Sequence, residues 1–121
     1  MKYLNKKIQT PDGKFDSLKE YKRWEQLVAL EDSGVISKLQ RQVRFELVPK
    51  MRRTDGYTER SLSYIADFVY FDGDEMVVED VKPSFTSTKA EKRYKTTEAY
   101  KTFVIKRKLM LALKGIEIKE V

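Results

Sequence analysis

The stretch SYIADFVYFDGDEMVVEDVKP, residues Ser63 to Pro83, decides the fold of this chain. Two runs in it, Ser63 to Phe71 and Glu75 to Lys82, are rich in valine, isoleucine, phenylalanine and tyrosine, which is typical of β-strands. Asp72-Gly73 between them predicts a hairpin turn, because both residue types tolerate the positive φ angles of a two-residue turn. Few polar residues interrupt the runs, so we expect the hairpin in the middle of a sheet covered on both faces.

Three charged residues of this hairpin are unexpected in a buried sheet: Asp67, Asp80 and Lys82. Side chains alternate along a strand, so Asp80 and Lys82 share one face. A two-residue turn at Asp72-Gly73 places Asp67 diagonal to Asp80, and a four-residue loop places it directly opposite; both put the three side chains on one face. A three-residue loop would instead set Asp67 opposite Glu79, which would then be the motif acid rather than a surface residue.

Two carboxylates and an amine on one face predict a site for a hard divalent cation such as Mg²⁺. Such a cation can bridge a phosphate and lower the pKa of a bound water, which allows phosphodiester hydrolysis without a histidine base. Lys82 would orient that water and offset transition-state charge, and the carbonyl of Val81 is a further candidate ligand. The alternative is a simple ion pair between the strands, but an ion pair requires only one of the two acids.

The chain contains no histidine and no cysteine. This excludes thiolate nucleophiles, disulfides, ordinary zinc sites and mechanisms that use imidazole as a base. The net charge of +6 favours a polyanionic partner such as DNA, because lysines and arginines that neutralise phosphates release counterions. No apolar run approaches the length of a membrane span, and the basic start MKYLNKK lacks the apolar core of a secretory signal, so we expect a cytoplasmic protein without a membrane partner.

The flanking segments complete an α/β pattern in one domain of 121 residues. Residues 1–14 predict an N-terminal arm ending in a turn, 17–33 a helix, 43–47 a strand, 98–114 a helix and 116–121 a short final strand. The polar stretches 52–59 and 84–97 predict a turn or mobile loop and a flexible loop or weak helix, respectively. We therefore expect a central mixed β-sheet flanked by helices on both faces.

Glu20 has two interpretations at the start of the first helix. Ser17 and Glu20 form a capping-box pattern, in which the carboxylate only closes the helix end. Glu20 also lies within the apolar stripe defined by Trp24, Leu27 and Val28, so its carboxylate faces inward and can point at a metal. We favour the ligand role and keep the cap as the alternative.

Two basic clusters are candidate phosphate contacts. The triplet Lys106, Arg107 and Lys108 lies in the last predicted helix, and its alternative is a solvated face whose stems cover apolar neighbours. The second cluster lies in the segment before that helix, where a solvated mobile loop is the alternative; it comprises Lys89, Lys92 and Arg93.

The arrangement of Asp67, twelve intervening residues and Asp80-x-Lys82 after a helix bearing Glu20 resembles the PD-(D/E)XK nuclease superfamily. Ala66 stands where the superfamily name has proline. The segments FDSLKEYKRWEQL, YIADFVY, VVEDVKP and KRKLMLALKGIEIKEV are similar to a family of short phage proteins placed in that superfamily. Gln42 resembles a glutamine that some members keep near the site, with an ordinary exposed strand residue as the alternative.

The resemblance covers Phe15 to the C-terminus and implies a restriction-endonuclease-like core, also found in Holliday-junction resolvases and transposon-end nucleases. It implies a Mg²⁺ or Mn²⁺ requirement, with the catalytic set Glu20, Asp67, Asp80 and Lys82, and a role in phage DNA replication, recombination or packaging. We therefore expect a metal-dependent DNA endonuclease, acting on branched DNA by family analogy, with a homodimer for paired cuts. The alternative is a non-catalytic DNA-binding or replisome-accessory protein that retains the nuclease fold.

Overall fold

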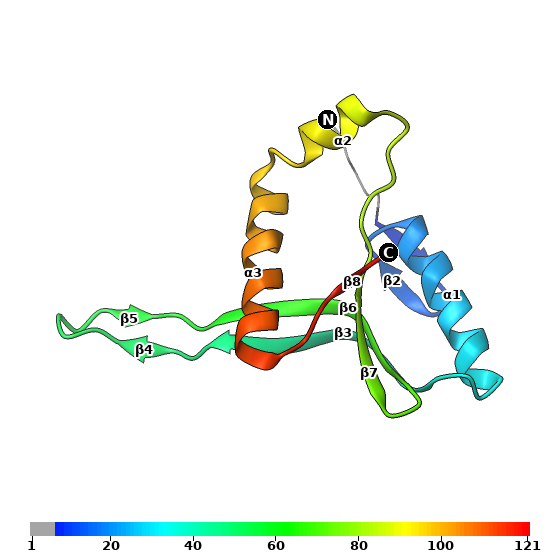
Figure 1. The fold of residues 1–121 in the computed structure, drawn as a ribbon, viewed down its shortest axis with the longest axis horizontal. Coiled ribbons are helices and arrows are strands. Elements are labelled where there is room, and N and C mark those ends of the chain that lie inside the picture. The colour runs from blue at the N-terminus through cyan, green and yellow to red at the C-terminus, as the bar shows by residue number, and fades with distance from the viewer. Residues whose placement is uncertain (1–6) are drawn as a thin grey trace.

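A computed structural model describes residues 7–121 and is built around a four-stranded sheet (Figure 1). Its strands lie in the order β3 (Ser37–Val48), β6 (Leu62–Asp72), β7 (Glu75–Asp80) and β8 (Lys119–Glu120). β3, β6 and β7 are antiparallel neighbours, and β8 runs parallel to β7. The sheet is therefore mixed, with the β6–β7 hairpin at its centre, as the sequence predicts.

Within residues 7–121, three helices accompany the sheet: α1 (Leu18–Asp32), α2 (Thr88–Tyr94) and α3 (Glu98–Lys114). The expected helix ends are confirmed. The Ser17 side chain accepts the N–H of Glu20 at the start of α1, and Gly115 ends α3 with φ 66°, a left-handed conformation that favours glycine. The segment expected as a loop or weak helix forms the short helix α2, because Ser87 caps it. Within the described part of the chain, no helix has the length and apolar character needed to span a membrane.

Helices α1 and α3 cover opposite faces of β6. Phe68 and Tyr70 belong to an apolar cluster with Leu27 of α1, whereas Val69 belongs to a cluster with Phe103 and Met110 of α3. Neighbouring residues of a strand point to opposite faces, so the two clusters lie on the two sides of the sheet. The expectation of helices on both faces is confirmed.

The alternation of faces along β6 changes at Asp67. Ala66 lies in the α3 cluster and Phe68 in the α1 cluster, although residues two apart should share a face. The pairs Val43↔Ala66 and Arg41↔Phe68 keep one register, which leaves Gln42 opposite Asp67. Gln42 of β3 has φ 51°, in the left-handed region, so the neighbouring strand also departs from regular alternation beside Asp67. Asp67 therefore lies at the point of β6 where alternate residues change from the side covered by α3 to the side covered by α1.

The hairpin turn lies one residue later than predicted. Asp72 pairs with Glu75, so the two-residue turn is Gly73-Asp74 rather than Asp72-Gly73, and Gly73 takes the positive φ of 63°. The register is the one expected from the four-residue loop, and Phe68, not Asp67, is opposite Glu79. The register of a three-residue loop, which would have set Asp67 opposite Glu79, is therefore not adopted.

Two segments expected as irregular are hairpins. The polar stretch 52–59 lies in a ribbon formed by β4 (Met51–Arg52) and β5 (Thr58–Glu59), which projects from the end of β3 and β6 (Figure 1). Part of the predicted N-terminal arm forms the hairpin of β1 (Ile8–Thr10) and β2 (Gly13–Phe15); residues 1–6 of that arm lie outside the described residues. β3 also starts six residues before the strand predicted at 43–47. In each case backbone pairing orders residues that lack the apolar alternation by which strands were predicted.

Candidate active site

Three carboxylates converge at the start of α1. Oxygen atoms of Asp16, Glu20 and Asp67 lie within 4.8 Å of one another. Asp16 precedes the N-cap residue Ser17, Glu20 lies in the first turn of α1, and Asp67 comes from β6. Asp80 is not a member of this group. The sequence interpretation missed Asp16, although its position four residues before Glu20 in the chain was the available signal.

Glu20 takes part in the helix cap through its main chain and not through its carboxylate, and its role as a metal ligand stays a prediction. Its backbone N–H closes the helix cap by donating to Ser17 Oγ at 3.1 Å. Its carboxylate is buried, with 3% of the residue exposed, and lies toward the sheet, where Gln42 donates to it and the Arg41 guanidinium lies 4.0 Å away. The cap therefore uses the main chain of Glu20 and leaves the carboxylate in the acidic group.

Gln42 connects the two inner carboxylates. Its amide Nε2 donates to Glu20 Oε2 at 3.2 Å and to Asp67 Oδ1 at 3.3 Å. The left-handed backbone of Gln42 costs on the order of 1–2 kcal/mol for a residue other than glycine. Strained backbone of this kind concentrates at functional sites. Gln42 is exposed, as one interpretation had it, and it is also part of the site.

Asp80 and Lys82 form a second group beside the first. Lys82 Nζ lies 2.8 Å from Asp80 Oδ1, and the Tyr64 hydroxyl donates to Asp80 Oδ2 at 2.6 Å. The Lys82 amine also lies 3.2 Å from the centre of the Phe103 ring, on the α3 side of the sheet. Asp80 and Lys82 thus share a face, as the strand alternation predicts.

Asp67 joins the two groups. Its Oδ1 atom accepts from Gln42 on the side of Glu20, and its Oδ2 atom accepts the backbone N–H of Val81 at 2.8 Å. The carbonyl of Val81 stays an untested candidate ligand. The nearby Lys82 carbonyl accepts a hydrogen bond from Lys19 of α1, which ties the end of the hairpin to the first helix.

The electrostatics of the site favour an added cation. Burial, followed by the charges of Asp67 and Asp16, raises the pKa of Glu20 from 4.5 to about 7, although Arg41 opposes the shift. Burial and then the charge of Asp80 raise the pKa of Asp67 from 3.8 to about 6. Desolvation and like charges both disfavour the ionised carboxylates. The site therefore holds protons that a divalent cation could replace.

Glu79 has a structural role. It is fully buried, and its carboxylate receives two hydrogen bonds from the Arg23 guanidinium, at 2.8 and 2.6 Å, and one from the Tyr70 hydroxyl. Burial raises the pKa of Glu79, but these hydrogen bonds outweigh it and hold the pKa below its ordinary value. The interpretations of Glu79 as a surface residue or as the motif acid of another register are both wrong, because it fastens α1 to β7.

The predicted phosphate contacts lie outside the acidic group. Arg107 is paired with Glu120 at 3.0 Å, whereas Lys108 is exposed on α3. Three further cations are exposed on α2: Lys89, Lys92 and Arg93. Their proposed contacts with DNA stay predictions.

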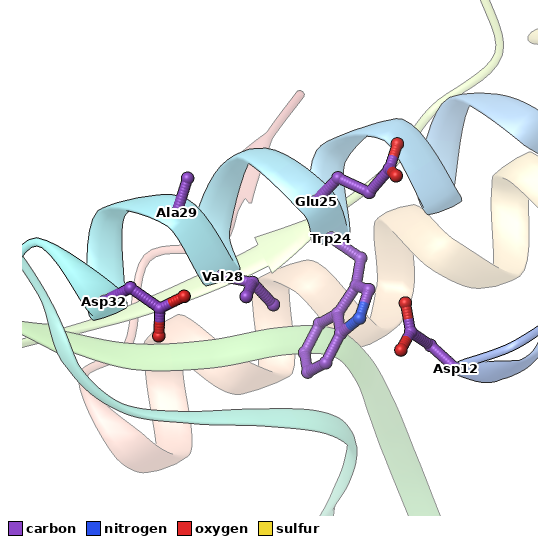
Figure 2. A pocket seen from close by; sticks show the side chains of 6 residues that line it. All are labelled: Asp12, Trp24, Glu25, Val28, Ala29 and Asp32. Atoms are coloured by element: carbon purple, nitrogen blue, oxygen red, sulfur yellow. The ribbon is translucent and has the colours of Figure 1, made fainter.

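A shallow pocket on α1 is separate from the predicted site. Figure 2 shows the Trp24 indole beside the Asp12 carboxylate, with Val28 and Asp32 farther along the helix. Glu25 and Ala29 complete the lining. None of the predicted catalytic residues lines this pocket, so it is not the candidate active site.

The comparisons with known proteins identify a family but no activity. No match was found among curated proteins, and none among solved structures. A family model described as "Protein of unknown function (DUF1064)" matches residues 1–115, which is most of the chain. The chain therefore belongs to the DUF1064 family.

Proposed function

We propose that this protein is a metal-dependent DNA endonuclease that hydrolyses phosphodiester bonds. The observation that carries the proposal is the position of Asp67, which lies between the carboxylate of Glu20 on one side and the Asp80–Lys82 pair on the other. The resemblance of Glu20, Asp67, Asp80 and Lys82 to the PD-(D/E)XK motif supports the same conclusion, and with it a restriction-endonuclease-like core.

The donor set fits Mg²⁺ or Mn²⁺. The converging atoms are carboxylate oxygens from Asp16, Glu20 and Asp67, and hard divalent cations prefer oxygen ligands. Burial first, and then the neighbouring carboxylates, raises the pKa values of Glu20 and Asp67, and a bound cation would offset both costs of ionising them. When bound, such a cation supplies Lewis acidity toward a phosphate and lowers the pKa of a water ligand.

The side chains around the acids have distinct roles in this proposal. Gln42 holds one oxygen of Glu20 and one of Asp67, so both carboxylates keep a fixed direction. Lys82, held by Asp80, presents an ammonium group that can donate to an anionic phosphate oxygen. Tyr64 fixes the other oxygen of Asp80 and so orients the pair. Paired cuts in duplex or branched DNA would use two copies of the chain related by a two-fold axis.

One observation favours the non-catalytic alternative, a DNA-binding or replisome-accessory protein with a nuclease-like fold. Both carboxylate oxygens of Asp80 are already engaged, one by Lys82 and one by Tyr64, so Asp80 must change partners before it can serve as a ligand. A protein that never makes this exchange would bind DNA without cutting it.

A cleavage assay separates the two functions. The purified protein is incubated with linear, nicked, single-stranded, flapped and four-way DNA in Mg²⁺, Mn²⁺ or EDTA, beside Asp67→Asn and the matched control Glu25→Gln on the exposed side of α1. We expect cation-dependent cleavage by the wild type and the control, and none by Asp67→Asn. DNA binding without cleavage in either metal would overturn the nuclease proposal in favour of the alternative.

A further inference from the structure

The β4–β5 arm, residues 49–61, is a part of the molecule that the proposed active site does not use. The arm extends beyond the sheet, away from α1 (Figure 1), and every residue from 49 to 57 is exposed. Neither apolar cluster includes a residue of the arm. A two-stranded ribbon with no packed face buries little apolar surface and adds little to the stability of the fold, which makes it a candidate binding surface.

Hydrogen bonds order the tip of the arm. Arg53 N–H donates to the Tyr57 carbonyl at 2.8 Å, and Gly56 N–H donates to the Arg53 carbonyl at 3.0 Å. The Asp55 carboxylate accepts the Tyr57 N–H at 2.9 Å. The arm is thus a preorganised ribbon with a turn at its tip, which agrees with the turn of the two expected alternatives and not with the mobile loop.

The charges of the arm separate onto its two faces. Arg52 pairs with Thr58 and Met51 with Glu59, the same register as Val48↔Leu62. Extending this register across the unpaired residues 49–50 and 60–61 puts Lys50 opposite Arg60. Residues opposite each other share a face, and so do residues two apart. Lys50, Arg52 and Arg60 therefore project from one face, with Thr58.

The acids of the arm are both engaged by one arginine. Arg53 forms ion pairs with Asp55 at 3.1 Å and with Glu59 at 3.6 Å, and its guanidinium also lies over the Tyr57 ring. In contrast, no ion pair within residues 7–121 involves Lys50, Arg52 or Arg60. One face of the ribbon therefore carries three uncompensated positive charges.

We propose that the β4–β5 arm lies in the major groove of duplex DNA, with Lys50, Arg52 and Arg60 against the phosphates. This inference rests on the proposed function and adds a positioning surface to it. Paired strands lie about 4.8 Å apart, and the major groove, about 12 Å wide, admits a two-stranded ribbon. The seven steps from Val48 to Asp55 span roughly 23 Å at about 3.3 Å per residue, enough to reach across one groove.

The test compares two double variants that lose the same charge. Lys50→Ala/Arg60→Ala removes two cations of the arm and leaves Arg52, which donates to the Gly56 carbonyl and helps to hold the tip. Lys22→Ala/Lys38→Asn removes two exposed cations far from the arm, and asparagine suits the left-handed φ of 56° at Lys38. Binding to fluorescein-labelled duplex DNA is measured by anisotropy at several salt concentrations, in EDTA, so that no cleavage occurs.

We expect the arm variant to bind duplex DNA roughly tenfold more weakly and to lose about two units of salt slope, one for each phosphate contact. The matched control should bind like the wild type. Equal binding by both variants would overturn the arm proposal. The arm proposal would also be overturned if the arm variant sediments as a monomer, the wild type as a dimer, and both bind DNA equally. The arm would then contact a second copy of the chain.

Failure of the arm proposal can be distinguished from failure of the proposed function. If the wild type binds duplex DNA through the arm but cuts no substrate in Mg²⁺ or Mn²⁺, the arm inference stands and the nuclease proposal is wrong. If both double variants cut and bind like the wild type, the nuclease proposal stands and the arm inference is wrong. A shortened arm, in which an Asn-Gly turn replaces residues 50–60, should reproduce the weaker binding while keeping the unfolding midpoint of the core.

Discussion

Replacement of Glu20 by glutamine should stabilise the cation-free protein at neutral pH. The pKa of Glu20 is 4.5 in its ordinary state and about 7 in the fold, so between these values the folded chain holds a proton that the unfolded chain has released. Stability therefore falls as pH rises through this window, at about 1.4 kcal/mol per pH unit and about 3 kcal/mol in all. Only 3% of Glu20 is exposed, so solvent screens this penalty weakly. Glutamine cannot ionise, and the variant avoids the loss.

Urea unfolding in EDTA, from about pH 4.5 to about pH 8, measures the effect for the wild type, Glu20→Gln and the control Glu25→Gln. The free-energy difference between Glu20→Gln and the wild type should grow from near zero to about 3 kcal/mol across this range, while the exposed control stays near the wild type. Added Mg²⁺ should narrow the difference, because the cation stabilises only the chain that keeps the ligand. A difference that does not change with pH would refute the reasoning.

Three further predictions concern other residues. Asp80→Asn should abolish cleavage, because the change removes a proposed ligand of the cation. DNA binding should be undiminished, because the change also removes one negative charge near the phosphate. A gel assay that still shows cleavage would exclude Asp80 as an essential ligand. Glu79→Ala should lower the free energy of unfolding by about 3–5 kcal/mol, since it leaves the partly buried Arg23 guanidinium without its partner; a loss under about 1 kcal/mol in a urea melt would contradict the structural role. Lys108→Ala should weaken duplex binding and remove about one unit of salt slope, and an unchanged slope would make that face of α3 merely solvated.

The main elements of the fold could be predicted from local sequence. Ser17 and Gly115 mark helix ends through their own capping chemistry, and the strand-like runs around Asp67 and Asp80 give the central hairpin. The turn at the tip of the arm was among the expected alternatives, but the paired strands β4 and β5 could not be predicted, because their residues are polar and their order comes from pairing rather than from apolar periodicity.

The candidate site was only partly predictable for a related reason. Strand alternation correctly places Asp80 with Lys82, but it assumes that each strand keeps one face throughout. The faces of β6 change at Asp67, opposite the left-handed Gln42 of β3, and the Asp67 carboxylate lies with those of Asp16 and Glu20. A glutamine in this conformation has no signature in a single sequence, since the backbone is held by tertiary contacts.

The most direct test of the central claim is a calorimetric titration of Mn²⁺ into the wild type and Asp67→Asn at about pH 6.5, in two buffers with different ionisation enthalpies. Glu20, with a pKa of about 7, is mostly protonated at this pH, so a bound cation must displace its proton. We predict that the wild type binds Mn²⁺ with buffer-dependent heat, which reports proton release, and that Asp67→Asn binds at least about tenfold more weakly. No binding by the wild type, or equal binding by the two proteins, would contradict the assignment of this site to a divalent cation.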